Sequence, residues 1–244
     1  MRIITVILFY IAFLSVPFVQ CVFANTDLQT QEQLSVRDWS GYHSGLLLGA
    51  EFGESRHKTG GFGYNSDNDK WTYHQSGLNA AGEFGYNYKW NQLIVGPKIE
   101  LGYINLKGQG TQSSSPGYDT VGRTSSDLYS ILGLNIGKDF NHYLVYITGG
   151  RMGVNYTQGI KDSCNTAPCG GGIVNTKDRG LVWGYALGGG VERFVQKDWS
   201  IKLESIYFNL NKKGFKGSTD LGNTYRWNAQ TYGYIFRCGV NYYF

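Results

Sequence analysis

The chain has 244 residues with a net charge of +4, which is too small to indicate nucleic-acid binding. It contains 35 Gly without a three-residue period and 16% aromatic residues, which exclude collagen and a disordered chain. Charged residues make up only 16%, and a mean hydropathy of −0.30 with a single long apolar run argues against a helical membrane protein.

That apolar run is the first predicted element. Arg2 precedes a charge-free stretch from residue 3 to 26, and Val22-Phe23-Ala24 provides a cleavage site of the A-x-A type. We therefore expect residues 1–24 to be a signal peptide, 25–39 a periplasmic segment and 40–244 the folded domain. An uncleaved anchor is one alternative. A lipoprotein cysteine at Cys21 is another, although Gln20 stands where a small residue is expected.

After the export signal, large apolar residues alternate with small or polar ones at a period of two, which predicts β-strands. The last segment shows this most clearly: Tyr234, Phe236 and Val240 share one face, while Arg237 and Asn241 lie on the other. The second face is rich in glycine, which no solvated surface requires. The pattern indicates a barrel in lipid. The eight predicted strands are residues 40–54, 76–90, 93–106, 127–140, 143–156, 181–194, 199–210 and 224–244.

The connections between these strands alternate in length. Residues 91–92, 141–142 and 195–198 form short turns, which are flanked by aromatic residues such as Trp90 and Trp199. The connections at 55–75, 107–126, 157–180 and 211–223 are long. The sequence therefore predicts an all-β, eight-stranded antiparallel transmembrane β-barrel with short periplasmic turns, four long external loops and both termini on the periplasmic side.

Several charged residues are predicted to face the barrel interior. Because an eight-stranded barrel is just wide enough for its own side chains, we expect these charges to pair and plug the interior. They do not form an open catalytic cleft. The nine predicted interior charges are Glu51, Glu83, Lys98, Glu100, Arg151, Glu192, Lys202, Glu204 and Arg237.

Three cysteines follow the predicted cleavage site. Cys164 and Cys169 lie close together in a Gly-rich segment, and in an exported chain we expect them to form a loop disulfide. A zinc site is the weaker alternative, because no second ligand pair lies nearby. Cys238 is left over as a free thiol, which strand alternation places in lipid.

Several stretches carry a family resemblance. The sequence resembles the small outer-membrane β-barrel proteins of alphaproteobacteria, a group that includes surface antigens and hemin-binding proteins. These are related to opacity-type porins and to the membrane domain of outer membrane protein A. In this family the fourth strand usually carries inward arginines, where this chain has Gly133 and Asn135. The matching stretches are WSGY at 39–42, GEFGYNY at 82–88, YITGG at 146–150, GGGVE at 188–192 and WSIKLE at 199–204.

The resemblance extends to the C-terminus and to the expected partners. Val240, Tyr242 and Phe244 resemble the terminal signature that the barrel-insertion machinery reads. The resemblance implies a location in the bacterial outer membrane, in contact with its lipid and lipopolysaccharide. No cofactor is required, although hemin binding would fit the family.

The function predicted on this basis is that of a non-enzymatic surface protein, which contributes to envelope integrity and contacts ligands or a host surface through its loops. Lys212, Lys213 and Lys216 in the fourth loop favour anionic ligands. The alternative is a small porin or a hemin-uptake protein, with His57, His74, Tyr64 and Tyr73 as candidate iron ligands.

An outer-membrane lipid-modifying enzyme is a third function class. Such an enzyme needs a nucleophile close to a base. His43 and Ser44 are neighbours in a predicted strand, so their side chains point to opposite faces and cannot form such a pair. The sequence therefore favours a protein that is not an enzyme.

Overall fold

The computed structural model describes residues 38–59, 70–112, 119–140, 142–163 and 172–244. All regular structure in these ranges is β-strand, and none of the described segments is a helix long and apolar enough to cross a membrane. The strands are β1 (Gly41–Thr59), β2 (Lys70–Trp90), β3 (Leu93–Ile104), β4 (Lys107–Thr111), β5 (Val121–Phe140), β6 (Tyr143–Asp162), β7 (Val174–Phe194), β8 (Trp199–Leu210), β9 (Lys213–Ser218) and β10 (Thr224–Tyr243).

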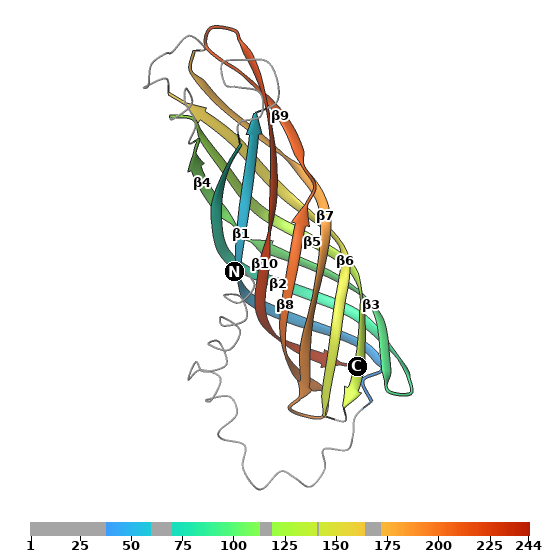
Figure 1. Cartoon of the computed structure of the whole chain (residues 1–244). Coiled ribbons are helices and arrows are strands. Elements are labelled where there is room, and N and C mark those ends of the chain that lie inside the picture. Colours follow the sequence, from blue (N-terminus) through green and yellow to red (C-terminus); the bar gives the residue numbers. More distant parts are fainter. Residues whose placement is uncertain (1–37, 60–69, 113–118, 141, 164–171) are drawn as a thin grey trace, which may run out of the picture. The chain divides into compact units, whose positions relative to one another are not determined.

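The strands form one closed antiparallel ring (Figure 1). β4 continues β3 along the wall, and β9 continues β8. The ten strands therefore occupy eight strand positions around the barrel. β1 pairs with β2 on one side and with β10 on the other, where Leu46 lies opposite Val240. Closure leaves the ring without a free edge, as a sheet in lipid requires. The predicted fold class and strand number are confirmed.

The C-terminus lies at the end of the barrel where the short turns are found (Figure 1). Asn91 takes a φ of 56°, in the left-handed region that asparagine tolerates, and with Gln92 it forms the two-residue turn between β2 and β3. Short turns mark the periplasmic end of an outer-membrane barrel. The opposite end, where β4 and β9 lie, is therefore the external end.

Most strands extend further toward the external end than the sequence predicted. β1 continues to Thr59, β6 to Asp162, and β7 begins at Val174, so much of the predicted loops is barrel wall. In the extension of β1 both faces are polar: Arg56 points outward, while Ser55 and His57 point inward. Because apolar residues no longer alternate with polar ones there, periodicity gave no strand signal.

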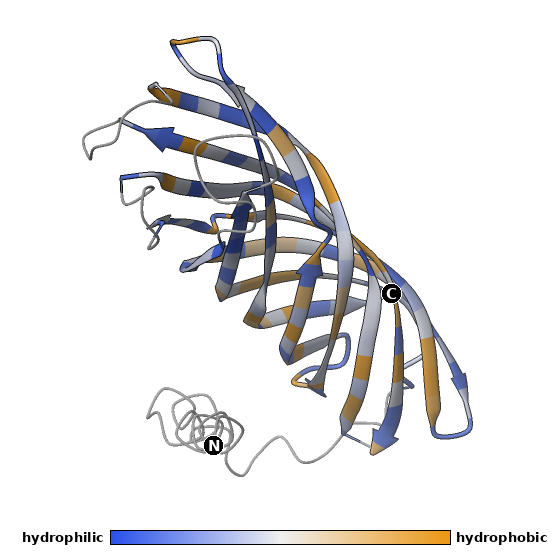
Figure 2. Cartoon of the chain, turned by 45° about the horizontal axis from the view of Figure 1, so that its top comes forward, coloured by the Kyte–Doolittle hydropathy of each residue, from blue (hydrophilic) through white to orange (hydrophobic). Residues whose placement is uncertain are grey.

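The outer face of the barrel changes character along its axis. In the half nearer the short turns, large apolar residues that point outward alternate with inward residues. Figure 2 shows hydrophobic residues as orange bands that alternate with white or blue bands along single strands. Toward the external end the outward residues become polar. This apolar outer face is the surface that contacts lipid. Its members include Leu46, Leu48, Phe52, Leu78, Phe84, Leu101, Leu132, Leu134, Ile147, Leu187, Leu203, Phe236 and Val240.

Two local features adjust which residues face inward. The register between β5 and β6 shifts between Ser126 and Tyr129, so even-numbered residues of β5 face inward before this bulge and odd-numbered ones after it. Gly45 faces inward beside Asn241, and a Cβ at Gly45 would overlap the Asn241 side chain. The glycines of the inner face thus make room for larger residues on the neighbouring strand.

Candidate functional site: the filled interior of the barrel

Side chains fill the interior in successive layers along the barrel axis. Near the periplasmic end, Trp39, Ile94, Leu144, Phe194 and Tyr243 form an apolar cluster. A network of charged residues lies above it, followed by an apolar belt that includes Ile131, Met152 and Ile235. Polar and aromatic residues occupy the external half. The charged network is the candidate functional site.

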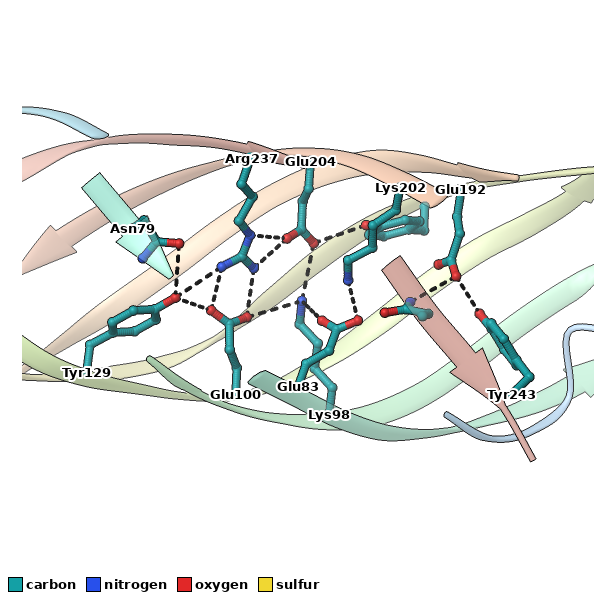
Figure 3. Close-up of polar contacts among 12 residues, drawn as sticks. Asn79, Glu83, Lys98, Glu100, Tyr129, Glu192, Lys202, Glu204, Arg237 and Tyr243 are labelled. Atoms are coloured by element: carbon teal, nitrogen blue, oxygen red, sulfur yellow. Dashed lines mark hydrogen bonds and ion pairs between the residues drawn. The ribbon is translucent and has the colours of Figure 1, made fainter. Parts of the chain in front are cut away.

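Arg237 on β10 lies between two carboxylates (Figure 3). Its Nε donates a hydrogen bond to Oε2 of Glu204 at 2.8 Å, and its Nη2 donates to Oε2 of Glu100 at 2.7 Å. The Tyr129 hydroxyl donates to Glu100 at 2.6 Å. The planar guanidinium suits this arrangement, because its five N–H groups can reach both acids at once.

The two lysines complete the network (Figure 3). Nζ of Lys98 lies 3.2 Å from Oε1 of Glu204 and 4.0 Å from Oε2 of Glu83. Lys202 pairs with the other oxygen of Glu83. Three acids therefore face three bases across the barrel, all of them buried. Buried charges are costly unless paired, so this balance is what makes a charged interior tolerable.

Two further interior acids lie outside the balanced network. Glu192 is surrounded by neutral donors: Asn241 Nδ2 and the Tyr243 hydroxyl each donate to its Oε1 at 2.9 Å, and Ser200 also donates to it. Glu51 is fully buried, and neither carboxylate oxygen has a hydrogen-bond partner among the described residues. Glu51 is thus an interior acid without a stabilising contact.

Eight of the nine predicted interior charges are buried in the barrel, but the prediction for Arg151 is wrong. Arg151 is exposed on the outer face of β6, where its guanidinium lies over the Trp183 ring. The first half of β6 is apolar on both faces, so alternation did not decide which face is inner. Burial of Met152 in the apolar belt orients the strand and places Arg151 outside.

The apolar belt is the part of the interior that sequence reasoning missed. We expected the inner face to be polar or glycine-rich, yet Ile206, Phe208 and Leu210 are buried inside. A signal was present in β8, because continuing the spacing of Lys202 and Glu204 leads directly to these three residues. The belt separates the charged network from the polar external half.

The external half contains a hydroxyl cluster. The Tyr156 hydroxyl lies 2.7 Å from Oγ1 of Thr231, and Nε2 of Gln75 donates to Oγ of Ser55 at 2.8 Å. The Tyr73 hydroxyl donates to Oγ1 of Thr124 at 3.1 Å. These contacts join several strands across the interior, so polar side chains also fill the barrel where it projects beyond the lipid.

Of the candidate hemin ligands, the structure brings two together. The Tyr73 hydroxyl lies 2.9 Å from Nε2 of His57, and the His57 ring stacks with Trp71 and Tyr73. Burial lowers the pKa of His57, which lies beyond the apolar outer face, to about 4. His74 points to the outer face, and Tyr64 lies outside the described residues. Iron ligation through Nε2 of His57 would require its contact with the Tyr73 hydroxyl to break and the buried ring to become accessible.

Of the predicted loop sites, the three lysines lie within the described residues and the cysteine pair does not. Lys213 and Lys216 lie in β9, and Lys213 forms an ion pair of 2.7 Å with Asp178. Lys212 and Lys216 are exposed. The predicted pair Cys164 and Cys169 lies outside the described residues. Cys238 is a free thiol, exposed on the outer face where strand alternation places it.

The C-terminal strand has the predicted facing. Val240 and Phe244 are exposed on the lipid face, and the Tyr242 ring packs against Trp199 with ring centroids 5.1 Å apart.

The expected separation of the His43 and Ser44 side chains is also observed, because His43 is buried against Tyr243 while Ser44 is on the outer side. Among the described residues no group of three or more His, Cys, Asp or Glu could hold a metal ion.

The sequence and fold were compared with known proteins. Residues 35–205 match the family model described as autotransporter beta-domain. The chain belongs to the autotransporter beta-domain family. The chain is 26% identical over 179 residues to the 22 kDa outer membrane protein of Rhizobium leguminosarum bv. viciae. The match covers 72% of this chain and 67% of that protein.

Solved structures of similar fold include two outer-membrane barrels. The outer membrane protease OmpT of Escherichia coli is 11% identical with a TM-score of 0.49, covering 86% of this chain and 100% of that chain. OprG of Pseudomonas aeruginosa is 12% identical with a TM-score of 0.49, and the match covers 84% of this chain and 98% of the OprG chain. The Rhizobium relative agrees with the resemblance to alphaproteobacterial outer-membrane proteins, and with its family match this beta-domain chain is located in the outer membrane.

Proposed function

We propose that this outer-membrane barrel is closed and non-enzymatic, that it contributes to envelope integrity, and that its external end contacts anionic surfaces. The observation that carries the proposal is the balanced network of Glu83, Glu100 and Glu204 with Lys98, Lys202 and Arg237. Ion pairs across the interior hold strands from opposite sides of the ring together. This arrangement supports a structural role for the barrel.

The layers above and below the network support a closed interior. A porin needs a continuous polar lumen, whereas the apolar belt around Met152 and Ile235 occupies the described interior. A hemin site needs an accessible ligand atom, whereas His57 is buried and its Nε2 is hydrogen-bonded to the Tyr73 hydroxyl. An enzyme needs an accessible base beside a nucleophile, and His43 is buried away from Ser44.

The contact function rests on the outer surface of the external end. Lys216 of β9 lies directly opposite Arg226 of β10, and both side chains are exposed. Lys212 is exposed nearby, before β9 begins. Adjacent cations of this kind attract sulfated glycans of a host surface or phosphates of lipopolysaccharide.

A deletion strain tests both halves of the proposal. Loss of the protein should increase sensitivity to sodium dodecyl sulfate and leave the uptake rate of a small hydrophilic β-lactam unchanged. The triple variant Lys212→Ser, Lys216→Ser and Arg226→Ser should restore detergent resistance but lose adhesion to heparin-coated beads. Slower β-lactam uptake in the deletion strain would instead identify a pore, and adhesion by the triple variant would contradict the contact site.

A further inference from the structure

Arg151 is a charged residue on the lipid-facing wall. It is exposed on β6 and lies between Leu132 of β5 and Tyr185 of β7, its cross-strand partners. These two neighbours are 54% and 50% exposed and belong to the outer face that contacts lipid. A cation in this setting is costly unless it reaches a polar partner. The chain therefore needs some arrangement that satisfies the Arg151 guanidinium.

The side chain of Arg151 extends toward the external end. Its guanidinium carbon lies 5.2 Å from the centroid of the Trp183 ring. Trp183 lies opposite Gly153, which is two residues nearer the external end than Arg151, and a Cβ at Gly153 would come within 2.9 Å of the ring. Because Gly153 has no side chain, the Trp183 indole can lie against the wall, and the Arg151 guanidinium lies over the indole ring. The guanidinium is thus carried along the wall toward the headgroups.

The neighbouring aromatic residues place this level at the edge of the outer leaflet. Tyr185, Tyr207 and Tyr234 form a row across β7, β8 and β10, with ring centroids 6.2 and 5.2 Å apart. Asn209 donates hydrogen bonds to the hydroxyls of Tyr185 and Tyr207. Aromatic side chains with bonded polar tips are typical of the interface between hydrocarbon and headgroups.

Arg151 differs from two outward arginines that lie further toward the external end, Arg56 of β1 and Arg179 of β7. Nε of Arg56 lies 3.3 Å from Glu54, and Nη2 of Arg179 lies 3.0 Å from Asp127. Among the described residues no carboxylate lies within 4.0 Å of Arg151. None of the described acidic residues therefore neutralises the Arg151 charge. At this level of the membrane the available anions are lipid phosphates.

We propose that Arg151 and Trp183 form a binding site for a phosphorylated glycolipid of the outer leaflet, the lipid A part of lipopolysaccharide. The guanidinium binds a lipid A phosphate through two parallel N–H groups, a geometry that arginine provides and lysine does not. Gly149 lies on the same face of β6 as Arg151 and carries no side chain, so an acyl chain can lie against the wall there, beside Leu134 of β5.

The test uses the refolded full-length barrel in detergent and native mass spectrometry. Probes are lipid A with two phosphates, the same lipid A after dephosphorylation, phosphatidylglycerol, and inorganic phosphate. Arg151→Gln should raise the dissociation constant for bisphosphorylated lipid A by about tenfold or more, the expected effect of losing charged hydrogen bonds. Arg56→Gln is the matched control, because Arg56 also lies over an aromatic ring, Tyr232, but is neutralised by Glu54.

The control variant should change lipid A affinity by less than about twofold. Heat-modifiable gel mobility establishes that each variant is folded, and Arg151→Lys, which keeps the charge, should bind with intermediate affinity. Equal lipid A binding by Arg151→Gln and the wild type would overturn the proposal. So would equal binding of dephosphorylated lipid A or phosphatidylglycerol, or saturation of the site by inorganic phosphate alone.

Discussion

Replacing Glu204 with alanine is expected to lower the free energy of unfolding by about 3–5 kcal/mol. The Glu204 carboxylate accepts hydrogen bonds from Nε of Arg237 at 2.8 Å and from Nζ of Lys98 at 3.2 Å. Both bases are buried, so losing this acid leaves positive charge without its partner in a medium that solvates it poorly. The bases that lose their partner are Arg237 and Lys98.

The measurement is urea unfolding of the refolded barrel in lipid vesicles, followed by tryptophan fluorescence. Glu51→Gln is the matched control, because Glu51 is equally buried but its carboxylate has no hydrogen-bond partner among the described residues. Its substitution removes an unpaired acid and should change stability by less than about 1 kcal/mol. Similar losses for both variants would contradict the role of the paired network.

Replacing Val240 with arginine should cost about 2–4 kcal/mol, because Val240 lies on the lipid face of β10 between Leu46 and Ile201, well inside the apolar surface. Phe244→Arg is the matched comparison. Phe244 is exposed on the same face but ends the chain at the periplasmic edge, so arginine there should cost about 0–1 kcal/mol. The difference between the two positions reports depth in the membrane.

Heat-modifiable gel mobility and urea unfolding measure the folding of these two variants. Asn241→Arg would not serve as a tolerated comparison, although Asn241 faces the interior and not the lipid. The structure shows that Asn241 is buried, donates to Glu192 and packs against Gly45, so a larger side chain does not fit there. Equal costs at Val240 and Phe244 would contradict the placement of β10 in lipid.

Alternation predicted the fold and much of the interior because lipid imposes opposite demands on the two faces of each strand. In β10 the outward row of Tyr234, Phe236 and Val240 and the inward Arg237 were predicted correctly. The same logic located the interior charges on β2, β3, β7 and β8. A strand with one apolar and one polar face has only one possible orientation.

Prediction failed where both faces are alike. β6 begins with apolar residues on both faces, so Arg151 was assigned to the wrong side until Met152 fixed the orientation. Near Thr59 both faces of β1 are polar, so the sequence pattern predicted a loop where the structure has barrel wall. Pairing across the interior was also beyond the sequence, because which base meets Glu83 depends on the stagger of distant strands.

Single-channel recording of the refolded protein in planar bilayers tests the central claim most directly. The charged network and the apolar belt fill the described interior, so the wild-type barrel should insert without producing unitary conductance steps at any ionic strength. Insertion can be followed independently by protease protection of the reconstituted barrel. Stable, reproducible open-channel steps from inserted wild-type protein would contradict a closed interior.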